Sequence, residues 1–208
     1  MLKGAVPQPT LRTFARACAM AFAILLFFSS CAGTSHRESS FSPVYVTDTK
    51  KLQVLPPRYM NGRLDDLQFF SGNFSGRNFY FQTYIQADKK GLSLTILNEM
   101  GFEMGSLSYT ETDLSFSSSY FPQGLKAEYM LLDLQNCYYD VDMLRESYAA
   151  AGLEFSTSTT EGTETRRIQD GDTIIEEITI EKREKGRKDI RIANNLRSYS
   201  YELRTIAQ

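Results

Sequence analysis

The sequence predicts a mainly β domain of the α+β class, in which a curved antiparallel sheet of about ten strands is covered by two helices. Phenylalanine and tyrosine are abundant, with 14 Phe, 12 Tyr and no Trp among 208 residues, and such residues favour pleated, half-buried surfaces. Apolar and polar residues alternate with period two along most of the chain, and one interval shows a helical period instead. A hydrophobic fraction of 42% fits one domain with a single core.

The predicted strands are the segments in which apolar residues recur at every second position. They are residues 77–86, 92–97, 101–109, 113–120, 153–158, 164–169, 173–182, 189–193 and 197–206. In the third segment the apolar phase shifts around Gly105, which indicates a β-bulge. Asp170 followed by Gly171 indicates a hairpin turn.

Two helices are predicted between residues 125 and 151, where the apolar residues recur at steps of three and four. The first helix lies within residues 125–141. The second runs from Val141 to Ala151, with Asp140 as its cap and Gly152 as its stop.

A sheet of this many strands curls, because twist accumulates from strand to strand. If the helices cover the concave face, the apolar residues between them form either an ordinary core or a pocket for a hydrophobic ligand, and the pattern leaves both open. The candidate ligand-binding residues are Phe79, Phe81, Leu92, Leu94, Ile96, Met130, Leu131, Leu134 and Tyr138.

The N-terminal 30 residues predict an export signal. The apolar run from Ala17 to Phe28 has 12 residues, which is short of the ~20 that a membrane-spanning helix needs. Arg12 and Arg16 precede this run, and the small residues Ser29 and Ser30 follow it, which is the order of a cleavable signal peptide.

Cys31 is the candidate site of lipid attachment. The sequence FFSSC, which ends at Cys31, resembles a bacterial lipobox. That resemblance implies a diacylglycerol and an acyl chain, such as palmitate, on the Cys31 sulfur, with no other cofactor. Ala32 in place of aspartate implies delivery to the outer membrane. The alternative is an ordinary cysteine that pairs with Cys137 in an oxidising compartment.

Residues 31–57 are rich in serine and threonine and end in two prolines, so they predict a flexible tether after the lipidated cysteine. Residues 58–208 then form the folded domain, and residues 1–30 are the signal peptide.

Composition excludes several kinds of chemistry. His36 is the only histidine, so His-based catalytic triads and multi-His metal sites are absent. The formal net charge of −2 does not favour nucleic acid as a partner. Adjacent residues of a strand point to opposite faces, so neither Asp65–Asp66 nor Glu176–Glu177 is expected to act as a general acid and base. We therefore expect no enzyme activity and no metal site.

The passage GLSLTILNEMGFEMGSLSY and the helical insertion resemble the LolA and LolB lipoprotein carriers. The segments VLPP, LNEMG, LLDLQNCYYDVDMLR and NNLRSYSYELRTI resemble a family of bacterial lipoproteins, of uncharacterised role, often encoded beside aryl-polyene synthesis genes. These resemblances cover about residues 52–206. They imply an open half-barrel with a two-helix lid over a hydrophobic cavity.

The resemblances imply a lipid-anchored periplasmic protein at the outer membrane that binds or transfers a lipid or acyl cargo. The alternative is a non-catalytic assembly lipoprotein with a packed core that meets a protein partner through its surface. In that case the charged segment EKREKGRKDIR, around Lys182 and Lys188, is a candidate contact; its other interpretation is a solvated hairpin.

Overall fold

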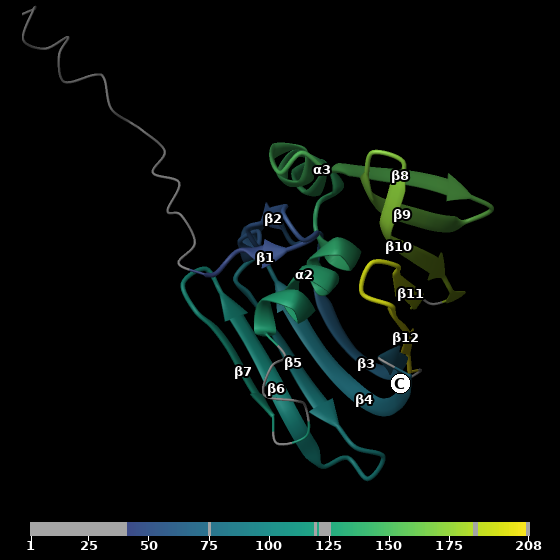
Figure 1. The fold of residues 1–208 in the computed structure, drawn as a ribbon. Helices are drawn as coiled ribbons and strands as arrows, with labels where there is room; N and C mark the ends of the chain where they lie inside the picture. Colours follow the sequence, from purple (N-terminus) through teal and green to yellow (C-terminus); the bar gives the residue numbers. More distant parts are fainter. Residues whose placement is uncertain (1–40, 75, 119, 121–125, 185–186, 207–208) are drawn as a thin grey trace, which may run out of the picture. The chain divides into compact units, whose positions relative to one another are not determined.

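A ten-stranded antiparallel sheet forms most of the fold (Figure 1). The computed structural model describes residues 41–74, 76–118, 120, 126–184 and 187–206. The strands of the sheet are β3 (Leu64–Phe74), β4 (Arg77–Asp88), β5 (Gly91–Leu97), β6 (Glu103–Thr110), β7 (Leu114–Ser118), β8 (Glu154–Thr160), β9 (Thr163–Asp170), β10 (Thr173–Lys182), β11 (Lys188–Asn194) and β12 (Tyr199–Thr205). The prediction of a mainly antiparallel β fold with about ten strands is confirmed.

Neighbouring strands follow the order β7-β6-β5-β4-β3-β12-β11-β10-β9-β8. The last strand, β12, pairs with the first long strand, β3, and this pairing joins an N-terminal half of the sheet (β3–β7) to a C-terminal half (β8–β12). The edge strands β7 and β8 do not pair with each other, so the sheet is open.

Strand β3 was not predicted, because its sequence LDDLQFFSGNF does not alternate. Gln68 faces the interior and is 3% exposed, whereas the neighbouring Phe69 faces outward and is 53% exposed. The two side chains therefore occupy faces opposite to those that their polarity favours.

The predicted bulge at Gly105 is confirmed. Ile96 pairs with Gly105 and Leu97 with Glu103, which leaves Met104 as the extra residue on β6. A Cβ atom on Gly105 would lie 2.8 Å from the carbonyl oxygen of Ser117, so a side chain has no room there.

The β9–β10 hairpin forms one position later than predicted. Asp170 pairs with Thr173, so the turn residues are Gly171 and Asp172. Gly171 has a φ of +57°, a conformation that glycine adopts without strain.

Both predicted helices are present, as α2 (Ala127–Tyr138) and α3 (Val141–Ala150). The carboxylate of Asp140 caps α3 by accepting hydrogen bonds from the backbone N–H groups of Asp142 and Met143. Helix α2 lies within the curve of the sheet and contacts both β7 and β10, whereas α3 lies beside β8 (Figure 1). The helices therefore do not form a two-helix lid: α2 fills the concave side and α3 packs at one edge.

The predicted flexible tether is wrong for its second part. Residues 41–57 contain the short hairpin of β1 (Val44–Tyr45) and β2 (Lys51–Leu52), followed by the 3-10 turn η1 (Pro57–Tyr59). Four side chains of this segment are at most 4% exposed: Val44, Val46, Leu52 and Val54. Their burial contributes to the core, which the serine-rich composition did not indicate. Residues 31–40 lie outside the described part of the chain.

Candidate functional site

Most of the apolar side chains that were predicted to bind a ligand lie in the packed core. Seven are at most 6% exposed, namely Phe81, Leu92, Leu94, Ile96, Leu131, Leu134 and Tyr138. The other two, Phe79 and Met130, are partly buried and pack against that core. The structure thus brings all nine together, from β4, β5 and α2, in one cluster.

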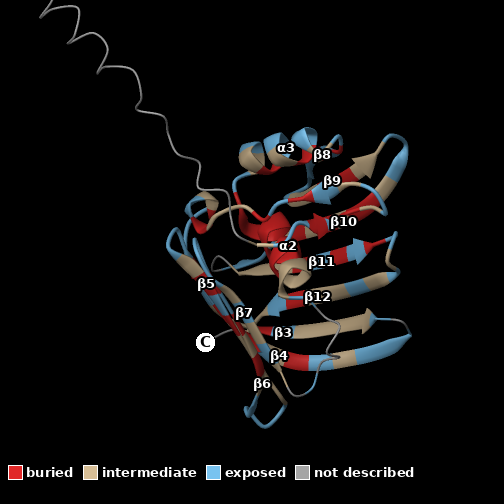
Figure 2. Cartoon of the chain, turned by 60° about the vertical axis from the view of Figure 1, so that its left-hand side comes forward, coloured by how far each residue is buried: buried red, intermediate tan, exposed pale blue. Residues whose placement is uncertain are grey.

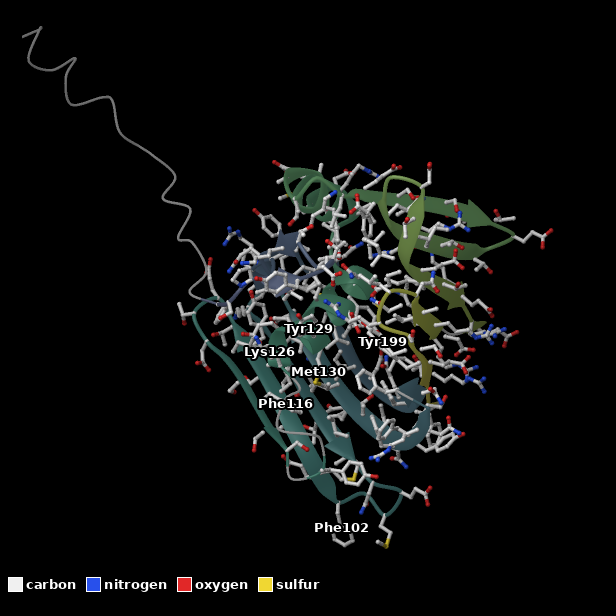
Figure 3. All side chains as sticks on the ribbon, in the orientation of Figure 1. Phe102, Phe116, Lys126, Tyr129, Met130 and Tyr199 are labelled. Carbon is white, nitrogen blue, oxygen red and sulfur yellow. The ribbon has the colours of Figure 1, made fainter. Side chains whose placement is uncertain are left out.

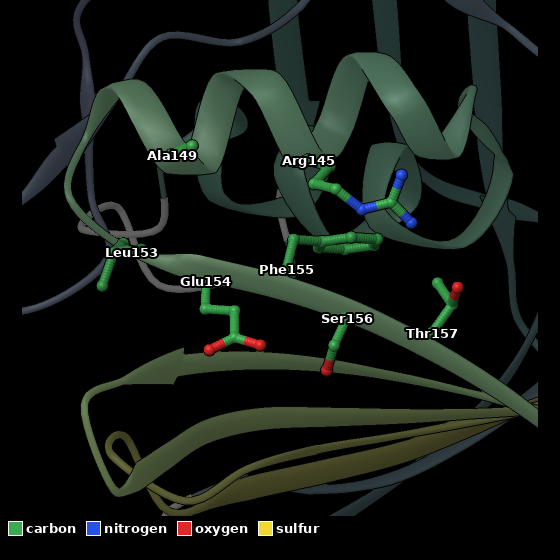
Figure 4. Close-up of a pocket in the computed structure, with 7 residues that line it drawn as sticks. All are labelled: Arg145, Ala149, Leu153, Glu154, Phe155, Ser156 and Thr157. Atoms are coloured by element: carbon green, nitrogen blue, oxygen red, sulfur yellow. The ribbon is translucent and has the colours of Figure 1, made fainter.

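Helix α2 occupies the place where a cavity was expected. All eight residues from Leu131 to Tyr138 are buried, so this part of the helix is enclosed on every side (Figure 2). One surface hollow of about 320 Å³ lies between α3 and β8, where Arg145 extends over Phe155 (Figure 4). Another, of about 280 Å³, lies at Arg183 and Arg187. None of the nine predicted residues lines either hollow.

One edge of the sheet carries exposed apolar side chains. At this edge, which we call the apolar rim, β3, β5, β7 and β11 end and β4, β6 and β12 begin. Its exposed large side chains are Phe74 (48%), Met100 (78%), Phe102 (64%), Tyr120 (59%) and Leu196 (46%). Figure 3 shows Phe102 at the tip of the β5–β6 hairpin, with Phe116 and Met130 nearer the centre of the domain.

The opposite edge, the polar rim, carries hydrophilic turns instead. Its turn residues include Lys89, Lys90, Glu111, Thr112, Asp113, Glu161, Arg183, Glu184 and Arg187. Among the described residues, the two rims thus differ in the kind of surface that they present, and of the two it is the apolar rim that carries large exposed apolar side chains.

The turn that carries Met100 and Phe102 is held by Asn98. Its side-chain oxygen accepts hydrogen bonds from the backbone N–H groups of Met100 (3.0 Å) and Phe102 (2.9 Å). Gly101 donates its N–H to the carbonyl oxygen of Asn98 and has a φ of +81°. The two exposed apolar side chains are therefore presented by an ordered turn.

Behind the apolar rim, aromatic rings form a strip across β4, β3 and β12. The ring centres of Phe81 and Phe70 are 4.3 Å apart, and those of Phe70 and Tyr201 are 4.9 Å apart. Gly72 makes this approach possible, because a Cβ atom there would lie 2.7 Å from the Cβ of Tyr201. The strip continues the core toward the apolar rim.

A buried polar network joins α2 to the C-terminal half of the sheet. The Asp133 carboxylate on α2 accepts hydrogen bonds from the hydroxyls of Tyr199 (3.0 Å) and Tyr201 (2.9 Å) on β12. Glu176 on β10 accepts from the amides of Asn136 (3.0 Å) and Asn194 (2.9 Å). Each buried carboxyl group therefore has two hydrogen-bond donors, as buried charges require.

Two further groups complete this network. The hydroxyl of Tyr148 on α3 donates to the Asn136 side-chain oxygen at 3.0 Å. Arg166 on β9, which is 5% exposed, donates to the backbone oxygen of Asn136 at 2.8 Å and is paired with Glu164. Asn136 therefore contacts groups from three other elements.

The environment raises the pKa of both carboxyl groups. Burial raises the pKa of Asp133 well above its ordinary value, and the neighbouring Glu176 adds to the rise. Burial also raises the pKa of Glu176. Asn194 accepts from the backbone N–H of Arg197, so its NH₂ group faces Glu176 and can only donate. The phenols beside Asp133 can donate or accept, so Asp133 is the carboxyl group better able to hold a proton.

Neither Glu176 nor Asp133 was predicted to be a site residue. The available signal was an acidic residue inside an apolar face: Glu176 interrupts the isoleucines of its strand, and Asp133 lies among leucines. Glu176 and Glu177 do face opposite ways, as predicted, because Glu177 pairs with Arg167 on the outer face.

Cys137 is a buried thiol that is 2% exposed, and burial raises its pKa. Cys31, the predicted lipidation site, lies outside the described residues. Among the residues that are described, no group of three or more His, Cys, Asp or Glu side chains is placed to hold a metal ion. No helix of that same part of the chain is long and apolar enough to cross a membrane.

A family model described as "Protein of unknown function (DUF3261)" matches residues 66–207. The chain belongs to the DUF3261 family. The matched span of the DUF3261 chain starts within β3 and includes both helices and every later strand of the sheet. It therefore contains the aromatic strip, the polar network and the apolar rim. No curated protein matches the chain.

Proposed function

We propose that this protein is a non-catalytic, LolB-like lipoprotein that binds or passes on the apolar part of a lipid. In this proposal it is exported, acylated on Cys31 and held at the outer membrane, with its domain in the periplasm. The lipobox-like sequence before Cys31 supports the anchor, and the resemblance to the LolA and LolB carriers supports the class of cargo.

The observation that carries the proposal is the set of partly buried apolar side chains that pack against the core, together with the exposed apolar side chains of the apolar rim; we call them the apolar path. The path begins at the aromatic strip and includes the partly buried side chains Phe79, Met104, Phe116 and Met130. It ends at the exposed Phe74, Met100 and Phe102. An acyl chain laid along such a path gains roughly 0.8 kcal/mol for each buried CH₂ group.

Because α2 fills the interior, a ligand would have to bind outside it. Because buried side chains of α2, such as Leu131 and Leu134, fill the concave side, the proposed site is the partly buried apolar surface between α2 and the apolar rim and not a closed cavity. Apolar contact is non-directional, so the site would select for an acyl chain and not for one head group.

The proposal can be tested in producing cells fed a photoactivatable, alkyne-tagged palmitate. After illumination, we expect adducts on the peptides that contain Phe79 and Met130, together with light-independent label on Cys31. The double variant Phe79→Ser/Met130→Ser should lose the light-dependent adducts. The control Phe69→Ser, on the outer face of β3, should keep them.

Two results would count against this function: light-dependent adducts spread evenly over the chain, or adducts unchanged in the double variant. Absence of label on Cys31 would contradict the proposed anchor. The light-dependent adducts would still test the proposed binding site.

The filled interior also favours a second candidate, an assembly lipoprotein that acts through surface contacts. The segment around Lys182 and Lys188 was its candidate contact, but the exposed Arg183 there is paired with Glu181 at 2.6 Å and Asp189 at 2.9 Å. Reversing the charges of Lys182 and Lys188 should abolish partner capture under this candidate and leave palmitate labelling unchanged.

A further inference from the structure

The outer face of β4 carries an alternating row of amide and phenol side chains. The inward residues Phe81, Thr83 and Ile85 are buried, so the intervening positions face away from the core. These outward side chains are Asn78, Tyr80, Gln82, Tyr84 and Gln86.

Two exposed aromatic rings lie next to each other on this face. Tyr80 is 67% exposed and Phe69 of β3 is 53% exposed. Phe69 pairs with Gln82, and Ser71 pairs with Tyr80, so the two rings occupy diagonal positions on adjacent strands. Diagonal neighbours of this kind are about 7–8 Å apart and within reach of a single ligand.

The polar groups beside the rings are ordered by hydrogen bonds. The hydroxyl of Tyr84 donates to Asp65 at 2.6 Å, and the amide of Gln86 donates to the Tyr84 hydroxyl at 3.0 Å. A ligand that met these side chains would therefore find them already oriented, which lowers the entropic cost of binding.

Hydroxyl groups extend the same face across β5, β6 and β7. Tyr84 pairs with Thr95, Thr95 with Ser106, and Ser106 with Ser117, which forms one row across four strands. The parallel row consists of Gln86, Ser93, Ser108 and Ser115. Adjacent strands are about 4.8 Å apart, so each row presents a polar side chain at that interval.

These two rows contain no charged side chain, although 23% of the whole sequence is charged. The same face changes character on the other side of β3, where Arg191 pairs with Glu202 and Arg167 pairs with Glu177. The two rows from β4 to β7 are therefore uncharged, and Asp65 of β3, which pairs with Gln86 and accepts the hydrogen bond from Tyr84, is a carboxylate beside them.

From this arrangement we propose that the outer face of β3–β7 binds an uncharged glycan strand. A sugar ring has an apolar C–H face that suits the rings of Phe69 and Tyr80, and hydroxyl edges that suit amides and hydroxyls. A polyanion would need arginine or lysine, which the two rows lack. A bilayer would need a continuous apolar surface, which the serines and glutamines interrupt.

The test uses the full-length, isotope-labelled protein in a zwitterionic detergent that contains no sugar, titrated with chitohexaose and separately with maltohexaose. At least one of these uncharged oligosaccharides should shift the backbone amide signals of residues 78–86, 93–95 and 106–108. Tyr80→Ala should weaken binding about tenfold, as loss of an aromatic contact does. Thr95→Val, which keeps the shape and removes the hydroxyl, should weaken it by about threefold.

Phe102→Ala is the matched control, because Phe102 is as exposed as Tyr80 but lies at the apolar rim. It should leave oligosaccharide binding unchanged. The proposal is overturned if neither oligosaccharide binds, if Tyr80→Ala binds normally, or if dextran sulfate competes for the same signals. Shifts that depend on protein concentration without sugar would assign this face to a second copy of the chain and also overturn it.

The experiments distinguish a failure of the proposed glycan binding from a failure of the proposed lipid binding. The Tyr80→Ala variant should keep its palmitate adducts, because Tyr80 faces away from α2 and the aromatic strip.

Discussion

The two halves of the sheet hold the central helix by different kinds of interaction. Toward β3–β7, the interior is formed mainly by apolar side chains such as Leu94 and Ile96, and the Gln68 amide of β3 donates a buried hydrogen bond to the Tyr138 hydroxyl of α2 at 3.1 Å. Toward β8–β12, α2 meets the hydrogen-bonded network of Asp133 and Glu176. Apolar packing tolerates changes of shape when volume is kept, whereas buried polar groups require particular partners. Mutational sensitivity and pH dependence should therefore be concentrated on the C-terminal side of α2.

The largest effect is expected at Asn136, which is 1% exposed and contacts both Glu176 and Tyr148. Asn136→Leu removes one of the two hydrogen-bond donors of the buried Glu176 and leaves the buried Tyr148 hydroxyl without its acceptor, so it should lower the free energy of unfolding by about 3–5 kcal/mol. Urea denaturation measures this. Asn195→Leu, at an exposed neighbouring asparagine, is the control. A loss below ~1 kcal/mol at Asn136 would mean that the network contributes little.

On the apolar side of α2, the loss of unfolding free energy caused by a substitution should depend on the side-chain volume that it removes. Leu131 is completely buried, so Leu131→Ala should lower the free energy of unfolding by about 2–5 kcal/mol. Leu131→Met keeps the volume and should cost less than ~1.5 kcal/mol. If Leu131→Ala and Leu131→Met lower the free energy of unfolding equally, the apolar side of α2 does not tolerate changes of shape at constant volume.

The network should also make stability fall as the pH rises. The pKa of Asp133 is raised in the folded state, so the folded protein holds a proton that the unfolded chain has lost above its ordinary pKa. That contribution is present at low pH and disappears as the pH rises through the folded-state pKa. Urea denaturation from pH 4 to pH 8 measures it, and Asp133→Asn should flatten the slope.

Glu202 on the outer face should change stability with pH in the opposite direction to Asp133. Partial burial opposes ionisation, but hydrogen bonds from Arg204 and Arg191 outweigh it and lower the pKa of Glu202. Its contribution should be present above the unfolded-state pKa and lost on acidification. A Glu202→Gln variant with the same pH slope as Asp133→Asn would contradict the assignment of the two groups.

The smallest effect is expected for the exposed ion pairs of the C-terminal half. Arg191 lies 3.1 Å from Glu202, and its side chain is 62% exposed. Arg191→Gln should change the free energy of unfolding by at most about 1 kcal/mol, and the difference should shrink in 1 M salt. A larger, salt-independent loss would show that the outer face also contributes specific buried interactions.

The sequence was informative where one face of an element is apolar and the other polar. The alternation in residues 77–86 and 92–97 placed Phe81, Leu92 and Ile96 on the inner face, and all three are buried. The helical stripe and the Asp140 cap could also be predicted from the sequence, because both depend on residues close together in the chain.

The missed features depend on contacts between distant residues. Asp133 lies 66 residues from its partner Tyr199, and Glu176 lies 40 residues from Asn136. Neither pairing follows from local periodicity. For the same reason Val44 and Leu52 were assigned to a tether, since their burial depends on packing against α2 and the sheet.

The side chains predicted to bind a hydrophobic ligand share one apolar face, and the structure shows that α2 covers most of that face. Six of the nine candidates lie on β5 or α2 with at most 6% exposure because α2 itself fills the space, and Phe81 on β4 is equally buried in the aromatic strip. Local pattern shows which face is apolar, but it does not show what covers that face.

The most direct test of the proposed anchor and ligand is native mass spectrometry of the protein purified in detergent from the cells that produce it. We predict a chain that begins at Cys31, carries covalent acyl chains on that residue, and retains a further non-covalent hydrophobic mass that Phe79→Ser/Met130→Ser loses. An unacylated chain with no bound hydrophobic mass would contradict both the anchor and the ligand.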